Sequence, residues 1–246
     1  MRLANKAALV TGAGSGLGRE TALYLAEEGA AVAVNDVNAA SAEETAMEIR
    51  AKGGTAIAVP ADVSNSTAVR EMFASVLRRF GTLDILVNNA GIVDVAETSS
   101  LSDEAWRRVI GVHLDGTFFC TREALKTMLP KRSGKIVNVS SVVGMTGGVG
   151  MAHYAAAKAG VFSFTATVGR EVASKGVNVN AVAPGAVETP MLARLQDQGL
   201  RYGPPPPIKR AARSREVASL IAYLASDEAS YLCGETININ GGGLVK

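Results

Sequence analysis

A tyrosine and a lysine four residues apart are the first pair whose types and spacing could do chemistry. Tyr154 and Lys158 fall in an expected helix, where this spacing puts both side chains on one face. A phenol with a pKa of about 10 is a poor base at neutral pH, but a nearby ammonium favours the phenolate. At about 4 Å and an effective dielectric constant of about 20, the attraction is roughly 4 kcal/mol before desolvation. The pair could do general acid–base catalysis, although this spacing also occurs by chance.

A glycine-rich turn near the start of the chain indicates a nucleotide site. Residues Thr11–Gly18 read T-G-x-x-x-G-x-G and lie between an expected first strand and first helix. Glycines let backbone N–H groups approach a pyrophosphate, and the helix N-terminus adds partial positive charge. The pattern departs from G-x-G-x-x-G because position 17 is Leu17, and no Gly-Lys-Ser/Thr closes it as in a P-loop. A plain turn is the alternative, but the position between strand and helix favours phosphate binding.

An acidic residue, Asp36, follows the second expected strand, 18 residues (36 − 18) beyond Gly18. A carboxylate there can accept hydrogen bonds from both ribose hydroxyls of an adenosine and would repel a 2′-phosphate. Neither Ser15 nor Val37 supplies a cation that would reverse this preference. Asp36 alone could be an ordinary surface residue, but downstream of the glycine turn it predicts NAD rather than NADP.

The elements that must position these residues alternate along the chain. Short apolar runs predict strands at Ala7–Val10, Ala31–Asn35, Thr55–Val59, Asp84–Val87, Lys135–Val139, Asn178–Val182 and Thr236–Ile239. Helical stretches lie between them at Leu17–Glu28, Ala39–Ala51, Thr67–Phe80, Asp103–Leu129, Ala152–Ser174 and Arg215–Ala225. This alternation predicts a parallel sheet with right-handed crossovers, whose ligands bind at the carboxyl ends of the strands.

We expect one domain over residues 1–246, with a cofactor half of about 1–130 and a catalytic and substrate half of about 131–246. No composition break marks a second domain. Ser64 and Ser66 are candidate starts for the third helix, and Ser102 suits the start of the fourth. The segment Met191–Pro207 reads equally well as a stiff surface connection or as part of a lid over a site.

Composition excludes several classes of protein. Hydrophobic residues make up 48% of the chain, enough for a sizeable core, and the net charge of +2 argues against a nucleic-acid binder. Two cysteines, Cys120 and Cys233, exclude a disulfide framework and a four-cysteine zinc site, and with two histidines we expect no metal. The longest charge-free stretch, Ile136–Ala157, carries polar residues and glycines that a membrane-spanning helix would not. We expect a soluble, cytoplasmic protein.

The ordered set of motifs resembles the short-chain dehydrogenase/reductase family from about Ala4 to Leu244. The family marks are Thr11–Gly18, Asp62-Val63, Asn88–Gly91, Ser141, Tyr154, Lys158, Pro184-Gly185, Thr189 and Gly241-Gly242. Any one motif could arise by chance, but the whole ordered set is highly specific. The resemblance implies an α/β fold with a Rossmann-like, doubly wound, seven-stranded parallel sheet and helices on both faces. It also implies NAD(P)-dependent oxidation of alcohols or reduction of carbonyls, and a homotetramer.

The same resemblance assigns roles to residues. Tyr154 would exchange the proton, Lys158 would lower the pKa of that phenol and bind the nicotinamide ribose, and Ser141 would hold the reacting oxygen. Ser140 is the neighbouring alternative, but strand alternation turns the two serine side chains opposite ways. The cofactor set comprises the turn residues Gly12, Ser15, Gly16, Leu17 and Gly18, then Asp36, Asp62 and Val63 at the adenosine end, Asn89, Ala90 and Gly91 beside the ribose, and Pro184, Gly185, Val187 and Thr189 at the nicotinamide carboxamide.

One position departs from the family pattern. The family usually has an asparagine in a V-N-L context that helps hold a water on the proton path to the lysine, whereas this chain reads Val112-His113-Leu114. A histidine can also donate and accept, and it titrates near neutral pH. We hypothesise that His113 keeps this relay, the alternative being a packed or helix-distorting side chain. His153 points elsewhere on the helix, and we interpret it as a rim or packing residue.

These features predict an NAD-dependent oxidoreductase that moves a hydride between the nicotinamide and a secondary alcohol or ketone. The stretches Val93–Val95, Gly144–Met151 and Met191–Pro207 are mostly apolar, which favours a small or medium hydrophobic alcohol or ketone as the substrate. One rival is a β-ketoacyl carrier-protein reductase, which the chain resembles around Tyr154–Gly160 and Arg170–Gly185. Such reductases usually use NADPH, which Asp36 disfavours.

Two further points separate the rivals. An acyl carrier would need a cationic docking surface, which Arg210, Arg213 and Arg215 could supply, although a solvated face near a helix start is the simpler interpretation. A second rival is a non-enzymatic sensor of NAD(H). A sensor could dispense with the serine, tyrosine and lysine that this chain retains.

Overall fold

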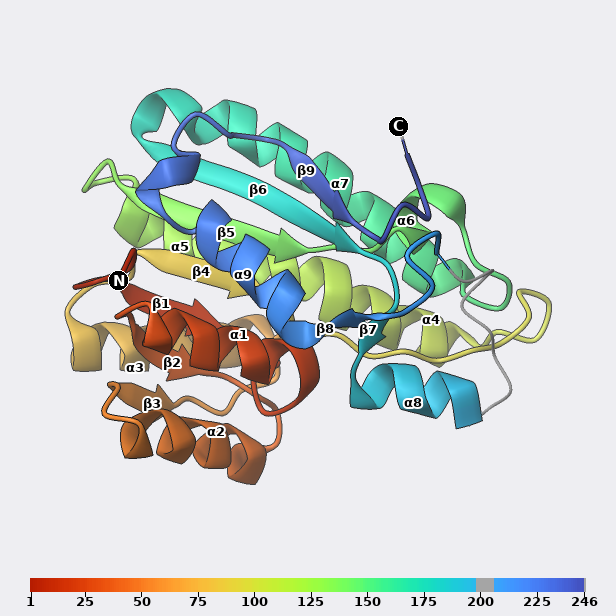
Figure 1. Cartoon of the computed structure of the whole chain (residues 1–246), viewed down its shortest axis with the longest axis horizontal. Coiled ribbons are helices and arrows are strands. Elements are labelled where there is room, and N and C mark those ends of the chain that lie inside the picture. Colours follow the sequence, from red (N-terminus) through yellow and green to blue (C-terminus); the bar gives the residue numbers. More distant parts are fainter. Residues whose placement is uncertain (198–205, 246) are drawn as a thin grey trace.

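Seven strands pair in parallel to form the main sheet of the computed structural model, which describes residues 1–197 and 206–245 (Figure 1). Their order across the sheet is β3-β2-β1-β4-β5-β6-β9. The strands are β1 (Ala7–Val10), β2 (Ala31–Val34), β3 (Ala56–Ala58), β4 (Ile85–Asn88), β5 (Gly134–Val139), β6 (Val177–Pro184) and β9 (Thr236–Ile239). All seven expected strands are present, and the order reverses between β1 and β4, where sheets of this kind bind ligands.

Helices cover both faces of the sheet, as the fold class predicts. On one face lie α1 (Gly16–Glu27), α2 (Ala39–Ala51) and α9 (Ser214–Leu224), and on the other α3 (Ser66–Phe80), α5 (Gly116–Met128) and α7 (Ala152–Val172). Leu9 and Val10 of β1 are both fully buried, and each packs into a different core cluster. Successive strand residues point to opposite faces, so a run that is apolar throughout requires cover on both sides.

Short elements lie beyond the carboxyl ends of the strands (Figure 1). They are α4 (Asp103–Ile110), α6 (Val143–Thr146), α8 (Pro190–Asp197), and the pair β7 (Val187–Glu188) and β8 (Ala212–Arg213). Of the expected lid or connection Met191–Pro207, the first part is helix α8, and residues 198–205 lie outside the described residues.

The starts of two helices can be compared with the sequence predictions. The helix α3 begins at Ser66, one of the two predicted starts. Its cap is Asn65, whose side-chain oxygen accepts hydrogen bonds from the backbone N–H groups of Thr67 and Ala68. Ser102 caps α4 as predicted, accepting from the N–H of Ala105.

The helix expected over Asp103–Leu129 is broken. A π-helical turn at Gly111–Asp115 separates α4 from α5. Gly116 follows the turn, and a Cβ there would lie 2.9 Å from Cγ2 of Val63, so the chain passes too close to this segment for a side chain. A π-turn inserts an extra residue into the helix and is frequent at functional sites. Here it carries His113.

Candidate active site

A cleft of about 540 Å³ opens at the carboxyl ends of the strands. It receives residues from the glycine turn, the loops after β2 and β4, the end of β5, helix α7 and the segment after β6. The lining includes Gly12, Ser15, Gly16, Leu17, Gly18, Asp36, Asn89, Gly91, His113, Ser141, Tyr154, Lys158, Pro184, Gly185, Val187 and Thr189. Most residues assigned from the sequence therefore share one cavity.

Ser141, Tyr154 and Lys158 meet in this cleft and are all buried. Helix α7 places the Lys158 ammonium nitrogen 5.7 Å from the centre of the Tyr154 ring, and this nitrogen donates to the carbonyl of Val139 at 2.7 Å. Ser141 follows β5, and its Oγ accepts from the N–H of Val143. The hydroxyl of Ser140 is engaged elsewhere, donating to the carbonyl of Lys158 at 2.8 Å.

Burial lowers the pKa of Lys158 from its ordinary 10.5 to about 7. The cause is desolvation, since taking the ammonium out of water disfavours its charged form. A lysine in this state can exchange a proton near neutral pH, and a neighbouring anion would favour its charged form.

The glycine turn is held against the segment after β4. The hydroxyl of Thr11 accepts from the N–H groups of Asn89 and Ala90, both at 3.0 Å, and the Asn89 amide donates to the carbonyls of Thr11 and Gly12. A Cβ at Gly18 would lie 2.1 Å from the Gly12 carbonyl oxygen. Because the turn closes this tightly only without side chains, it leaves a backbone cradle that fits a pyrophosphate. The sequence pattern contained Thr11 but did not show this role.

Asp36 lies at the edge of the same turn. Its carboxylate accepts one hydrogen bond from the N–H of Gly14 and one from the N–H of Asn38, each at 3.0 Å. A Cβ at Gly14 would lie 2.8 Å from the carboxylate, so this glycine lets the two segments approach. These two donors fix the carboxylate where it lines the cleft.

Three residues predicted to bind the cofactor lie outside the lining of the cleft as described. Asp62 is exposed and accepts from the N–H and hydroxyl of Ser64, while Val63 is buried in the core under α3 and α5. Ala90 packs against that same core. Their contact with a cofactor stays a prediction.

His113 connects the loop after β4 with the tyrosine. It is buried, its Nε2 lies 2.6 Å from the carbonyl oxygen and 3.0 Å from the N–H nitrogen of Ile92, and its ring meets the Tyr154 ring edge-on at 5.1 Å. A Cβ at Gly91 would lie 2.5 Å from the imidazole, so only glycine leaves room for it. Burial, and then the charge of Lys158, lower the pKa of His113 well below its ordinary 6.5. The near-neutral titration suggested by the sequence is therefore not what this environment favours.

His153 lies outside the cleft lining and is fully buried. Within the described part of the chain neither ring nitrogen has a hydrogen-bond partner, and burial lowers the pKa of this imidazole. Both features favour the packing interpretation.

Comparison with known proteins identifies the family. The model of the short chain dehydrogenases matches residues 6–199. A 3-oxoacyl-[acyl-carrier-protein] reductase, FabG, of Staphylococcus epidermidis is 44% identical over 243 residues, which span 97% of this chain and 98% of the relative. This chain belongs to the short-chain dehydrogenase family. It is an oxidoreductase.

Further relatives of this short-chain dehydrogenase cover nearly its whole length. A 3-oxoacyl-[acyl-carrier-protein] reductase of Synechocystis is 44% identical over 98% of this chain and 97% of the relative. Among solved structures, a putative gluconate dehydrogenase from Agrobacterium tumefaciens superposes with a TM-score of 0.93 at 34% identity, covering 99% of this chain and 98% of that one. The recognition from sequence motifs and the fold class are thus confirmed.

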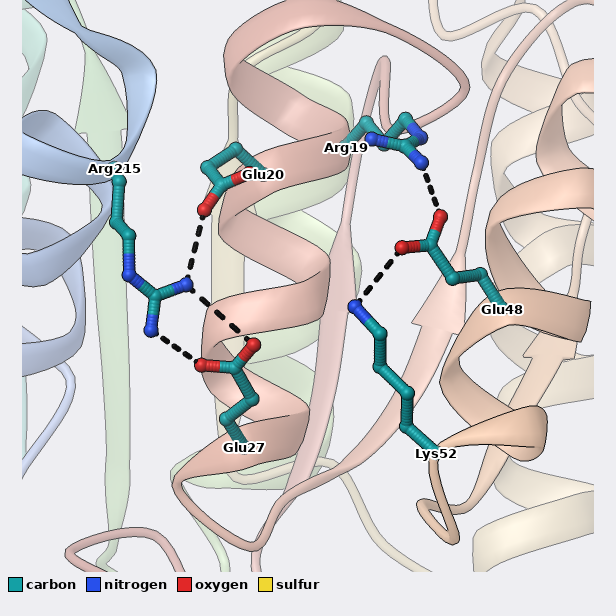
Figure 2. A network of polar contacts seen from close by, with 6 residues as sticks. All are labelled: Arg19, Glu20, Glu27, Glu48, Lys52 and Arg215. Atoms are coloured by element: carbon teal, nitrogen blue, oxygen red, sulfur yellow. Dashed lines mark hydrogen bonds and ion pairs between the residues drawn. The ribbon is translucent and has the colours of Figure 1, made fainter.

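The cationic surface considered for an acyl carrier is largely neutralised in this dehydrogenase. Arg210 makes two contacts of 2.7 Å with Glu216, and Arg215 binds Glu27 at 2.6 Å and Glu20 at 3.2 Å on α1 (Figure 2). A second network on the other side of α1 joins Glu48 to Arg19 and Lys52. These pairs connect α9 and α2 to α1, which favours a solvated ionic face over a docking site.

Two features are absent from the residues that the structure describes. No helix among them combines the length and apolarity that crossing a membrane requires. In the same ranges, no group of three or more His, Cys, Asp or Glu side chains gathers in a way that could hold a metal ion.

Proposed function

We propose that this chain is an NAD-dependent oxidoreductase that interconverts a secondary alcohol and a ketone, with NADP the poorer cofactor. One observation carries the proposal: a single cleft holds Ser141, Tyr154 and Lys158 together with the glycine turn and Asp36. The bound nicotinamide would supply the carbon that accepts or gives the hydride.

The side chains of the cleft exchange the proton, position the reactants and bind the cofactor. The Tyr154 phenolate takes the alcohol proton, and in the reverse direction the Tyr154 phenol gives a proton to the ketone oxygen. Ser141 holds the reacting oxygen, and Lys158 favours the phenolate and binds the nicotinamide ribose. His113 positions the Tyr154 ring through the edge-on contact and fixes the loop after β4 through Ile92. The turn residues would bind the pyrophosphate, and Pro184, Gly185, Val187 and Thr189 the carboxamide.

The preference for NAD rests on Asp36. Its carboxylate is already oriented by two backbone donors, so it can accept from both adenosine ribose hydroxyls without rearranging. A 2′-phosphate would bring like charge against it, and Ser15 at the turn offers no cation in compensation.

A cofactor comparison tests this proposal. Initial rates with NAD and NADP are measured across secondary alcohols for the parent and for the double variant Asp36→Ser, Ser15→Arg. The parent should favour NAD, and the variant should shift the ratio of kcat/KM toward NADP by about 10- to 100-fold, or about 1.4–2.7 kcal/mol. A parent that works mainly with NADP would overturn the reading of Asp36.

A 3-oxoacyl thioester is the second candidate substrate, because curated relatives with that activity in their names match nearly the whole chain. The ion pairs of Arg210 and Arg215 weigh against the carrier surface that such a substrate would need. Higher kcat/KM on a 3-oxoacyl thioester with NADPH than on simple ketones with NADH would put this candidate first. Tight NADH binding with no turnover of any carbonyl would instead favour the sensor.

We also propose a homotetramer in the cytoplasm. The family resemblance supports the assembly, and so does an apolar groove of about 440 Å³ along α5 and α7, where Phe118 is 41% exposed. Light scattering coupled to size exclusion should give four times the monomer mass of 25.4 kDa.

A further inference from the structure

The charged residues that line the cleft are distributed unevenly. Among the described lining residues, Asp36 is acidic and lies at the glycine turn, whereas Arg108 of α4 and Arg194 of α8 are cations on the short helices beyond the strand ends (Figure 1). Lys158 is the buried lysine of the reactive centre. In the sequence, the stretches at this end of the cleft are mostly apolar, and neither arginine belongs to a recognisable motif.

Each arginine is the sequence neighbour of a buried residue that shares an apolar cluster with Tyr154. Arg108 immediately precedes Val109, and Arg194 immediately precedes Leu195; these two buried residues belong to the apolar cluster that contains Tyr154. The opposite end of α8 lies over the glycine turn, since a Cβ at Gly16 would be 3.5 Å from Pro190. Arg194 is four residues further along, or about 6 Å of helix. It is therefore displaced from the phosphate cradle toward the Tyr154 cluster.

Among the described residues, Arg194 also lacks an acidic partner. Arg108 is held by Asp94, with Nη2 to Oδ2 at 2.6 Å, and Asp94 is in turn fixed by the N–H of Val95. Over residues 1–197 and 206–245, no carboxylate lies within ion-pair distance of Arg194. At this end of the cleft Asp94 thus pairs with Arg108, and no described carboxylate pairs with Arg194. The N–H donors of a guanidinium form a planar fork that matches a carboxylate.

We propose that Arg194, assisted by Arg108, binds a carboxylate on the substrate, so that the natural substrate is a hydroxy acid or oxo acid rather than an uncharged alcohol. This inference rests on the proposed function of the same cleft. The carbonyl or carbinol carbon lies at Ser141 and Tyr154, the connecting carbons lie against apolar side chains such as Ile92, Val93 and Met191, and the acid group lies at the arginines.

Matched pairs of substrates test this assignment. Rates with NADH are measured on 3-oxobutanoate and 4-oxopentanoate and on the methyl ester of each, which keeps the ketone and removes the charge. The parent should favour at least one acid over its ester by tenfold or more in kcat/KM. Arg194→Gln should remove that preference mainly by raising KM for the acid, Arg194→Lys should restore part of it, and the rates on both esters should stay unchanged. Arg70→Gln, an exposed arginine on α3 outside the cleft, is the control.

Three kinetic results would overturn the proposal. The first is a parent that favours the esters; the second is an equal loss on acid and ester in Arg194→Gln. The third is a rise in the KM for NADH alone, which would assign Arg194 to the cofactor phosphates. Calorimetric titration of the NADH-bound protein with each acid measures binding without turnover. If neither acid binds, the proposal is also contradicted. A failure of the proposed function is distinct, because then uncharged ketones are not reduced either.

Discussion

Burial of Lys158 gives the stability of the protein a defined pH dependence. Its pKa is about 7 in the folded chain against 10.5 for the exposed group. Between these values the unfolded chain binds a proton that the folded chain does not, so stability rises as pH increases through this window. Lys158 adds at most about 1.4 kcal/mol to the free energy of unfolding for each pH unit in this window.

The variant Lys158→Met isolates this effect. In urea unfolding of the cofactor-free protein, the free energy of unfolding of the parent should be higher at pH 9 than at pH 7. This increase should be smaller or absent in the variant, because methionine keeps the apolar bulk without the titrating group. Equal pH slopes in the two proteins would show that burial of Lys158 does not perturb its ionisation.

His113 is expected to work as a neutral positioning residue. With its pKa well below 6.5, the profile of kcat/KM should show no ionisation of this imidazole between pH 6 and 8. His113→Leu should destabilise the fold by about 1–3 kcal/mol, since the Ile92 backbone loses a buried partner, and should lower kcat. An acid limb near pH 6.5 that disappears in His113→Asn would instead support a titrating relay. Full activity and an unchanged profile in His113→Leu would remove His113 from the mechanism.

At the scale of the elements, the break between α4 and α5 is the main feature that the sequence pattern did not predict. Apolar residues continue at helical spacing through residues 103–129, and a single inserted residue shifts the register without interrupting them. The seven strands, by contrast, were predicted to within about two residues, since only strands covered on both faces are apolar throughout. Helices α6 and α8 are too short for periodicity to reveal.

Gly111, the first residue of the π-turn, and Gly116, which follows it, provide a matched test of its packing. Gly116→Ala should destabilise the protein by about 1–3 kcal/mol, because the new methyl group would lie 2.9 Å from Val63. Gly111→Ala should be neutral or slightly stabilising, because its nearest neighbour is Ser64 at 3.5 Å and its φ of −57° is helical. Urea midpoints of both variants measure the difference, and equal midpoints would mean that Gly116 is not a packing requirement.

At the scale of the whole molecule, the topology gathers residues that are far apart in sequence. The loops after β1, β2, β4, β5 and β6 all begin at the carboxyl edge of a parallel sheet. Gly12, Asp36, Asn89, Ser141 and Gly185 could therefore be assigned to one site from the order of strands and motifs along the sequence. Arg108 and Arg194 could not, because they carry no motif and α8 was not predicted. The converse holds for Asp62 and Val63. They belong to a sequence motif that predicts cofactor contact, but in this structure neither side chain lines the cleft.

The proposed function requires that a carbinol carbon is oxidised and reduced in this cleft, with Tyr154 as the proton-exchanging group. The most direct measurement is the initial rate of NADH oxidation by ketones and oxo acids in the parent and in Tyr154→Phe, with NADH binding followed by fluorescence in both. We expect turnover in the parent. In Tyr154→Phe we expect the rate to fall by about 100-fold or more while NADH binding is retained. Undiminished turnover in Tyr154→Phe would contradict the proposed function.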